Sequence, residues 1–210
     1  MLIFMNTLVR RYLYQEAYFE EVLVLTEGPL RDCKDIEALA HRFPKGWYEL
    51  SRLLPEDRVE FTRSFWLSRL SFNAKAHAGI SNFFRALDDI AVVLIKEHGV
   101  WNAQLIYSLA DNSSFFRGLL PAKEGEVEAL QQELGVGLPS DWAAFTRIHN
   151  GFGKLSELNM MKIEEIADAR RKMIDLIVKA SHPVRSGQTP IDPGSLIPFF
   201  EVSGLSSFQC

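Results

Sequence analysis

The sequence predicts an α+β protein, because segments with helical periodicity precede segments of strand character in both halves of the chain. In residues 1–120, several amphipathic stretches lead to the apolar run Ile90–Ile95 and a second strand-like run, Ala103–Leu109. In residues 121–210, helical stretches again precede short strands. Helices grouped ahead of a sheet favour α+β over alternating βαβ units. We therefore expect a helix-rich N-terminal region with a β-hairpin, residues 1–120, and a second domain, residues 121–210.

The first predicted elements are helices. A helical face through Leu8, Tyr12 and Phe19 continues to Val22 and Leu23, although Val22–Leu25 fits a short strand equally well. Asp35–His41 fits a short helix. After the turn Pro44–Gly46, a third stretch ends where Pro55 interrupts it; its apolar residues are Trp47, Leu50 and Leu54. Glu56 and Asp57 open a helix that we expect to be buried on more than one side, with the apolar residues Val59, Phe61, Phe65, Trp66, Leu67 and Leu70.

A hairpin follows these helices. A helix from Asn73 to Leu87, with Phe83 and Phe84 inward, leads to Ile90–Ile95, and His98–Gly99 supplies the turn before Ala103–Leu109. Phe115–Phe116 fits a third short strand. Gly118–Lys123, with Pro121, is the expected linker between the two domains.

The C-terminal half opens with two short helices. Val127, Leu130 and Leu134 share one helical stripe, and Gly135 suits the left-handed conformation that ends many helices. Leu138–Pro139 then starts the second helix, in which we expect Pro139 at the first position. The second helix places Trp142, Phe145 and Ile148 on its apolar face, and Asn150–Gly151 ends it.

These residues resemble the opening signature of the SUKH superfamily, which includes fungal cell-wall-synthesis regulators and bacterial toxin-immunity proteins. The later run Leu196–Phe199, followed by Glu201, resembles the family's next landmark, an apolar-Pro-Phe strand. The resemblance implies helices packed on an antiparallel or mixed sheet, a binding module, and no catalytic residues. It assigns a structural or binding role to Leu138, Pro139, Trp142, Phe145, Asn150, Gly151, Pro198 and Phe199.

The sheet implied by this resemblance is short. Family members usually run several strands further, whereas this chain ends at Cys210, within a second strand expected at Leu205–Gln209. Three explanations stay open: the chain is truncated, the N-terminal half completes the sheet, or a partner adds a strand to an open edge. The last explanation predicts oligomers formed through that edge.

The rest of the C-terminal half predicts one helix and one loop. Leu155–Met161 fits a strand or a turn, and the spacing from Ile163 to Ile177 predicts a helix that ends near Lys179. On this helix, Arg170, Arg171 and Lys172 are interpreted as a solvated face that pairs with Glu164, Glu165 and Asp168. His182–Gly194 is rich in Pro, Gly, Ser and Thr and is expected to be an exposed loop, functional or mobile.

Composition sets the class of protein. The 210 residues are 47% hydrophobic and 24% charged with a net charge of −4, which is ordinary for a soluble globular chain. Neither half is basic, so nucleic-acid binding is disfavoured. Two distant cysteines, Cys33 and Cys210, indicate a reducing compartment, and we expect the cytoplasm. Arg10 and Arg11 interrupt the apolar start too early for a signal peptide or a membrane span.

The side chains capable of chemistry do not form a recognisable site, and we expect no cofactor and no metal. The five histidines, His41, His77, His98, His149 and His182, are scattered and are interpreted as cap, turn or surface residues. Cys33 and His41 could form a thiol-imidazole pair, but their spacing does not bring them together, and Cys33 is interpreted as a small buried thiol. Two carboxylate pairs are interpreted as caps and turns, namely Asp32 with Asp35 and Asp88 with Asp89. Phe65, like the tryptophans Trp47, Trp66 and Trp142, is expected in the core. Trp101 is the best candidate for an exposed aromatic anchor, although partial burial is the favoured interpretation.

The sequence thus favours a non-catalytic protein-binding module, of immunity or regulatory type, whose partner in the immunity variant is a toxin domain. The alternative is an enzyme whose site lies at the junction of the two halves. A third hypothesis is a structural or regulatory subunit that dimerises through the strand edge near Phe199–Phe208.

Overall fold

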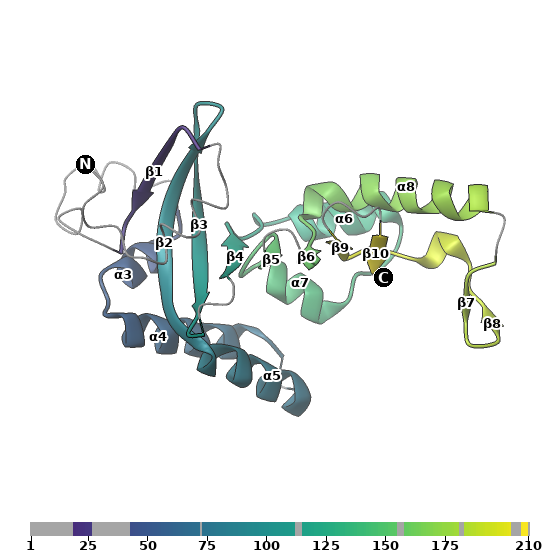
Figure 1. The fold of residues 1–210 in the computed structure, drawn as a ribbon. Helices are drawn as coiled ribbons and strands as arrows, with labels where there is room; N and C mark the ends of the chain where they lie inside the picture. The colour runs from purple at the N-terminus through teal and green to yellow at the C-terminus, as the bar shows by residue number, and fades with distance from the viewer. Residues whose placement is uncertain are drawn as a thin grey trace. The chain divides into compact units, whose positions relative to one another are not determined.

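The chain divides into two compact units, Met1–Leu120 and Pro121–Cys210. The structure, a computed structural model, describes residues 19–26, 43–71, 73–111, 115–154, 158–180, 183–202 and 207–209. Each unit combines helices with antiparallel strands, so the predicted α+β class is confirmed (Figure 1). The expected helix at Asp35–His41 lies outside the described residues.

A long hairpin forms the centre of the first unit. Strands β2 (Leu87–Glu97) and β3 (Val100–Leu109) pair antiparallel along their length. The turn between them consists of His98 and Gly99, whose φ angles are both positive, 50° and 74°. This backbone suits the right-handed twist of a hairpin, and histidine is among the non-glycine residues that tolerate it. The predicted hairpin and its turn are confirmed.

Two shorter strands extend this hairpin. Strand β1 (Glu21–Val24) pairs with β2, and strand β4 (Phe115–Leu119) pairs with β3. Of the two structures proposed for Val22–Leu25, the strand is therefore correct. Every residue from Ile90 to Ile95 is at most 1% exposed, so β2 is buried on both faces. This explains why its sequence is continuously apolar instead of alternating.

Within residues 43–85 of the first unit, the described helices are α3 (Lys45–Ser51), α4 (Pro55–Arg69) and α5 (Ala74–Arg85). Pro55 occupies the first turn of α4, where a missing N–H costs nothing. Asn73 caps α5, because its Oδ1 accepts the backbone N–H groups of Lys75 and Ala76 at 3.0 and 3.2 Å. Helices α4 and α5 thus begin within one residue of the expected starts at Glu56 and Asn73.

The predicted core face of α4 is partly wrong. The buried residues of the helix are Arg58, Thr62 and Trp66, which follow one another at intervals of four. Trp66 packs edge-on against Phe84 of α5, with ring centroids 5.1 Å apart. Phe61 and Phe65, both expected inside, are exposed. The helix buries one stripe of side chains. That stripe can include Arg58 because its charge pairs with the carboxylate of Asp89 on β2.

The second unit starts with α6 (Glu126–Leu134) and α7 (Ser140–Thr146). Gly135 has the predicted left-handed backbone, with a φ of 68°. Pro139 is the N-cap of α7 and not its first helical residue, which corrects the expected position by one residue. The reason is that its ψ of 129° is extended, as a capping residue requires.

A small antiparallel sheet and a long helix complete the second unit. Strand β5 (Phe152–Lys154) pairs with β6 (Leu158–Met160), β6 pairs with β9 (Phe200–Val202), and β9 pairs with β10 (Ser207–Gln209). Helix α8 (Ile163–Ala180) follows β6. The strand expected at Leu196–Phe199 is wrong, since β9 starts one residue later.

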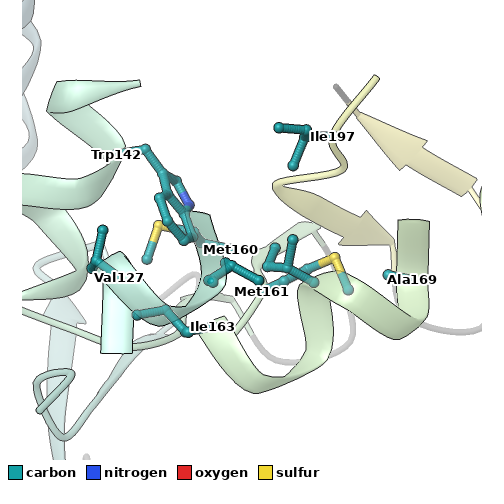
Figure 2. Packing of buried hydrophobic residues seen from close by; sticks show 9 residues of the cluster. Val127, Trp142, Met160, Met161, Ile163, Ala169 and Ile197 are labelled. Carbon is teal, nitrogen blue, oxygen red and sulfur yellow. The ribbon is translucent and has the colours of Figure 1, made fainter. Parts of the chain in front are cut away.

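The helices and strands of this unit share one core. Side chains from α6, α7, β6 and α8 converge with Ile197, the residue two before Phe199, as Figure 2 shows. Ile166 is completely buried in this cluster, whose other buried members are Val127, Leu130, Trp142, Met160, Met161, Ile163, Ala169 and Ile197. The predicted apolar stripes of α6 and α8 therefore face the same core.

The segment His182–Gly194 contains more structure than the predicted loop. Strands β7 (Arg185–Ser186) and β8 (Thr189–Pro190) pair as a short antiparallel hairpin, and the 3₁₀ turn η3 (Pro193–Ser195) follows. Gly187 supplies a φ of 60° in the turn. His182 itself lies outside the described residues.

Candidate functional site

The link between α6 and α7 is held by a side chain of α6. Gln131 Oε1 accepts the backbone N–H of Leu138 at 3.1 Å. Leu138 packs against the core of the second unit, whereas Pro139 is exposed. An exposed salt bridge of 2.9 Å joins Arg147, just after α7, to Glu128 of α6. The two helices are thus tied together on both sides of the motif.

Trp142 and Phe145 lie on the side of α7 that faces the core of the second unit. The Trp142 ring is buried and lies 5.1 Å from the ring of Phe199, centroid to centroid. Phe145 packs edge-on against Phe152 of β5 at 5.5 Å. The structure therefore brings the first motif, around α7, together with the second motif, Pro198–Phe199. Pro198 is buried, and the carbonyl oxygen of Phe199 accepts the N–H of Met161 at 2.9 Å.

Asn150 and Gly151 shape the entrance to α8. Asn150 Oδ1 accepts the backbone N–H of Ile163, the first residue of α8, at 2.8 Å, and its Nδ2 donates to Glu164 Oε2 at 2.9 Å. A side-chain oxygen in this place satisfies a helix N–H that has no partner within the helix. Gly151 has a φ of 105°, which strongly favours glycine.

The eight motif residues thus lie mainly at packing and capping positions. Their geometry is that of a scaffold, with Pro139 as an exposed exception. Most of the exposed surface of the second unit therefore comes from other residues.

The β7–β8 hairpin is such a surface. Each residue from Arg185 to Pro190 is exposed. The hairpin is nevertheless ordered by backbone bonds, since the N–H of Ile191 donates to the carbonyl of Val184 at 2.9 Å. Exposed side chains on a hydrogen-bonded backbone can meet a partner without first ordering a loop.

Arg170 of α8 binds the 3₁₀ turn η3, which follows this hairpin in the chain. Its guanidinium donates to the carbonyl of Leu134 at 3.3 Å and to the carbonyl of Gly194 in η3. Asp192 helps, because its Oδ1 accepts the N–H of Gly194 at 3.0 Å. Arg170 is half-buried, so interpreting it as part of a solvated face was wrong. The signal was present in the spacing, since Arg170 lies four residues after Ile166 and three before Met173.

Its neighbour Arg171 follows the prediction. The Arg171 side chain is exposed and pairs with Asp168 one turn earlier and with Glu133 of α6 at 3.8 Å. The basic run therefore divides by helix face, with Arg170 inward and Arg171 outward.

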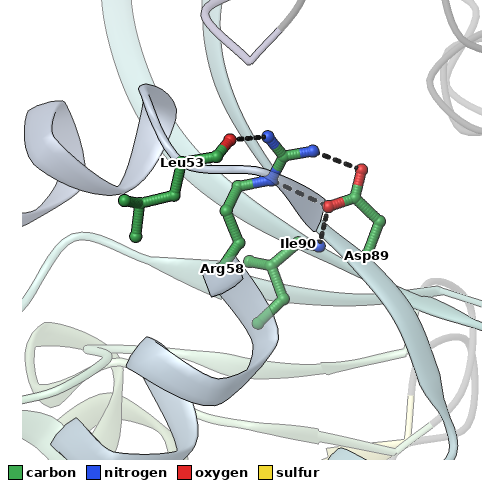
Figure 3. Close-up of polar contacts among 4 residues, drawn as sticks. All are labelled: Leu53, Arg58, Asp89 and Ile90. Atoms are coloured by element: carbon green, nitrogen blue, oxygen red, sulfur yellow. Dashed lines mark hydrogen bonds and ion pairs between the residues drawn. The ribbon is translucent and has the colours of Figure 1, made fainter. Parts of the chain in front are cut away.

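Asp89 has a role that the sequence did not reveal. It was expected to cap a helix or to lie in a turn. Instead, its carboxylate forms a buried ion pair with Arg58 of α4 (Figure 3). Arg58 Nε donates to Asp89 Oδ1 at 2.8 Å, and Nη2 donates to Oδ2 at 2.7 Å. The remaining Arg58 nitrogen donates to the carbonyl of Leu53 at 2.7 Å. Asp88 is exposed, so the two aspartates do not act as a pair.

Two further buried groups lie in apolar surroundings. His149 was expected in a cap, a turn or the surface, but it is 1% exposed and stacks on Phe152 with ring centroids 5.7 Å apart. Burial raises the pKa of Tyr107 well above its usual 10.0, and contact with Trp66 lowers it by less. Both side chains belong to the packed interior.

Trp101 is half-buried, which agrees with the interpretation favoured over an exposed anchor. The Lys96 ammonium lies 5.8 Å from the centre of its ring and also pairs with Glu21 at 2.6 Å. The tryptophan is therefore covered in part by a neighbouring strand residue.

Among the residues that the structure describes, no group of three or more His, Cys, Asp or Glu side chains could hold a metal ion. Cys33, His41, Asp32, Asp35 and Cys210 lie outside the described residues. The enzyme alternative, with its site at the junction of the halves, remains a prediction. Within the described ranges, no helix has both the length and the apolar character to cross a bilayer.

Comparison with known proteins gives a family match for the C-terminal part of the chain. Residues 121–210 match the model of the SMI1 / KNR4 family (SUKH-1), which confirms the resemblance seen in the motif residues. The matched range coincides with the second compact unit. No curated protein and no solved structure matches the chain.

Proposed function

We propose that residues 121–210 form a non-catalytic protein-binding domain of immunity or regulatory type. The observation that carries this proposal is the match of these residues to the SMI1 / KNR4 family (SUKH-1). The superfamily includes cell-wall-synthesis regulators and toxin-immunity proteins, both of which act without catalysing a reaction.

The proposed binding surface is the β7–β8 hairpin. The motif residues are used for packing and capping, while Arg185–Pro190 is exposed and leads into the turn η3, which Arg170 of α8 binds. A preformed hairpin loses little conformational entropy on binding, so its contacts contribute more of their energy to affinity.

The proposed partner is a protein with basic surface, and in the immunity type it is a toxin domain. Six exposed carboxylates of the second unit have no ion-pair partner among the described residues, namely Glu124, Asp141, Glu164, Asp175, Asp192 and Glu201. Complementary charge of this kind speeds association and disfavours acidic partners.

An affinity experiment tests the function. The full chain is immobilised and exposed to lysate of the organism that encodes it, and retained proteins are identified by mass spectrometry. We expect one stoichiometric protein, whose affinity for the purified chain is then measured by calorimetry. Gln188→Arg in the exposed hairpin should weaken that affinity about tenfold or more, as changes at a contact position do.

The matched control is Gln132→Arg, an exposed glutamine on α6 away from the hairpin. It adds the same side chain and charge, and it should leave the affinity unchanged. No captured protein at any salt concentration would contradict the proposed function. Equal weakening by both variants would contradict the hairpin as the surface while leaving the binding function intact.

We also propose a cytoplasmic location, supported by the two widely separated cysteines of the sequence, Cys33 and Cys210. Both thiols should react with a thiol reagent in the unreduced, denatured chain. Detection of a disulfide in freshly isolated protein would count against a reducing compartment.

A further inference from the structure

The outer face of α4 exposes large apolar side chains. Phe61 and Phe65 are 44% and 37% exposed, and Leu54, just before the helix, is 59% exposed. Phe61 and Phe65 lie four residues apart and are therefore neighbours on one stripe of the helix, whereas Leu54 is its extended N-cap residue. Two neighbouring aromatic rings on a helix surface form a patch that water solvates poorly.

The two ends of α4 carry opposite charges. Glu56 and Asp57 lie in the first turn, and Arg69 lies in the last. Among the described residues, neither Asp57 nor Arg69 has an ion-pair partner. The Arg69 guanidinium lies 5.4 Å from the centre of the Phe65 ring, and it therefore flanks the apolar patch.

The spacing of these residues is symmetric about the middle of the helix. Asp57 precedes Phe61 by four residues, and Arg69 follows Phe65 by four. In two antiparallel copies of α4 related by a two-fold axis at the level of Arg63, Phe61 lies level with the partner's Phe65. In the same arrangement, Asp57 lies level with the partner's Arg69. A two-fold interface requires this self-complementarity, in which residue i meets j and j meets i.

We propose that the outer face of α4 binds a second copy of this chain, with the two helices antiparallel. The phenylalanines form the centre of the contact, and the acidic first turn of each helix lies beside the basic last turn of the other. Antiparallel packing also sets the opposite ends of the two helix dipoles side by side. Arg63 does not face the partner, because it lies about 200° around the helix from Phe61 and pairs with Glu60.

The contact is small, so the dimer is weak and depends on concentration. Three apolar side chains per copy bury far less than the roughly 800 Å² per partner of a standard stable interface. The monomer therefore predominates in dilute solution, and the dimer fraction rises with concentration.

Sedimentation equilibrium of the full chain over a range of concentrations tests this inference. Phe61→Ser should abolish detectable association. Asp57→Arg and Arg69→Asp should each raise the dissociation constant about tenfold at low salt, because each places like charges together twice per dimer. The double variant Asp57→Arg/Arg69→Asp restores opposite charges across the two-fold axis, and it should recover most of the affinity.

Glu56→Arg is the matched control. It reverses a charge in the same first turn, with the same effect on the helix dipole, but its side chain points about 140° away from Phe61. The control should associate like the wild type. Circular dichroism and denaturation midpoints establish that each variant is folded before association is compared.

Two outcomes overturn the inference. One is a wild-type chain that stays monomeric at the highest concentration reached. The other is a dimer that Phe61→Ser and the charge reversals leave unchanged, which would move the contact to another surface, such as the strand edge at β10. Failure of the double variant to recover affinity contradicts the antiparallel pairing.

Discussion

Arg58 and Asp89 carry opposite charges where water scarcely reaches, with side chains 4% and 8% exposed. Arg58→Met keeps much of the apolar stem but leaves the carboxylate buried without its partner. We expect unfolding free energy to fall by about 3–5 kcal/mol, the usual cost of breaking a buried pair from one side. Denaturant titration followed by circular dichroism measures the change.

The exposed pair Arg63–Glu60 on the same helix provides the control. Arg63→Met should change stability by less than about 0.5 kcal/mol, since exposed pairs contribute little. Removing both buried charges with Arg58→Met/Asp89→Asn should cost less than Arg58→Met alone. Equal losses for the buried and exposed variants would show that the buried pair does not hold α4 to the sheet.

The buried phenol of Tyr107 should make the folded protein less stable at alkaline pH. Because burial raises the pKa of its phenol above the usual 10.0, the folded state keeps a proton that the unfolded state releases. The stability contributed by this group is fully present below pH 10.0 and falls as the pH rises above it, by up to about 1.4 kcal/mol per pH unit. Denaturation midpoints between neutral pH and strongly alkaline pH should therefore fall less steeply for Tyr107→Phe than for the wild type.

Single residues were predictable where the signal is local. Gly135 was identified because the end of a helix needs the left-handed backbone that glycine adopts readily. The ion pair of Arg58 and Asp89 was missed because the two residues lie on different elements, 31 residues apart. No local sequence pattern predicts such a contact. His149 was missed for a similar reason, since its burial depends on how β5 packs.

At the scale of elements, the end of α6 depends on one glycine. Gly135 has a φ of 68°, while Gly137, two residues later, has ordinary backbone, and an added Cβ at either position would meet nothing within 4 Å. Gly135→Ala should lower stability by about 1–2 kcal/mol through backbone strain alone. Gly137→Ala should be neutral or stabilising by a few tenths of a kcal/mol. Thermal unfolding of both variants measures these changes. Similar effects at the two sites would contradict backbone strain as the cause of the loss at Gly135.

Elements with strong periodicity were found from the sequence, and the shortest ones were not. Helices α6 and α8 and the β2–β3 hairpin each carry many residues of one pattern. β7 and β8 have two residues each, too few for any period to be visible. The apolar residues of α4 were ambiguous, because the pattern does not say which stripe meets the sheet and which stays outside.

At the scale of the whole molecule, we propose that the two compact units are separate domains that fold independently. A protease recognition site inserted between Leu120 and Pro121 would cut the chain at the boundary between them. We expect each half to remain folded after cleavage, because each has its own buried core. Circular dichroism and cooperative unfolding of the separated halves measure this.

The uncleaved insertion variant serves as the control for the added residues. If either half loses its cooperative unfolding only after cleavage, the chain is one folding unit with two lobes. The matched range of the family model, which covers residues 121–210, gives the same boundary from sequence similarity.

The double burial of β2 has a consequence for synthesis of the chain. Ile90–Ile95 is a six-residue apolar segment without charge, glycine or proline, the composition that forms stacked strands between chains when it is exposed. Helices α3, α4 and α5 precede it and leave the ribosome first, and α4 already carries Arg58. Helix α4 is therefore synthesised before β2 and can pack on it as soon as it emerges. This order shortens the time in which β2 segments of two nascent chains could aggregate.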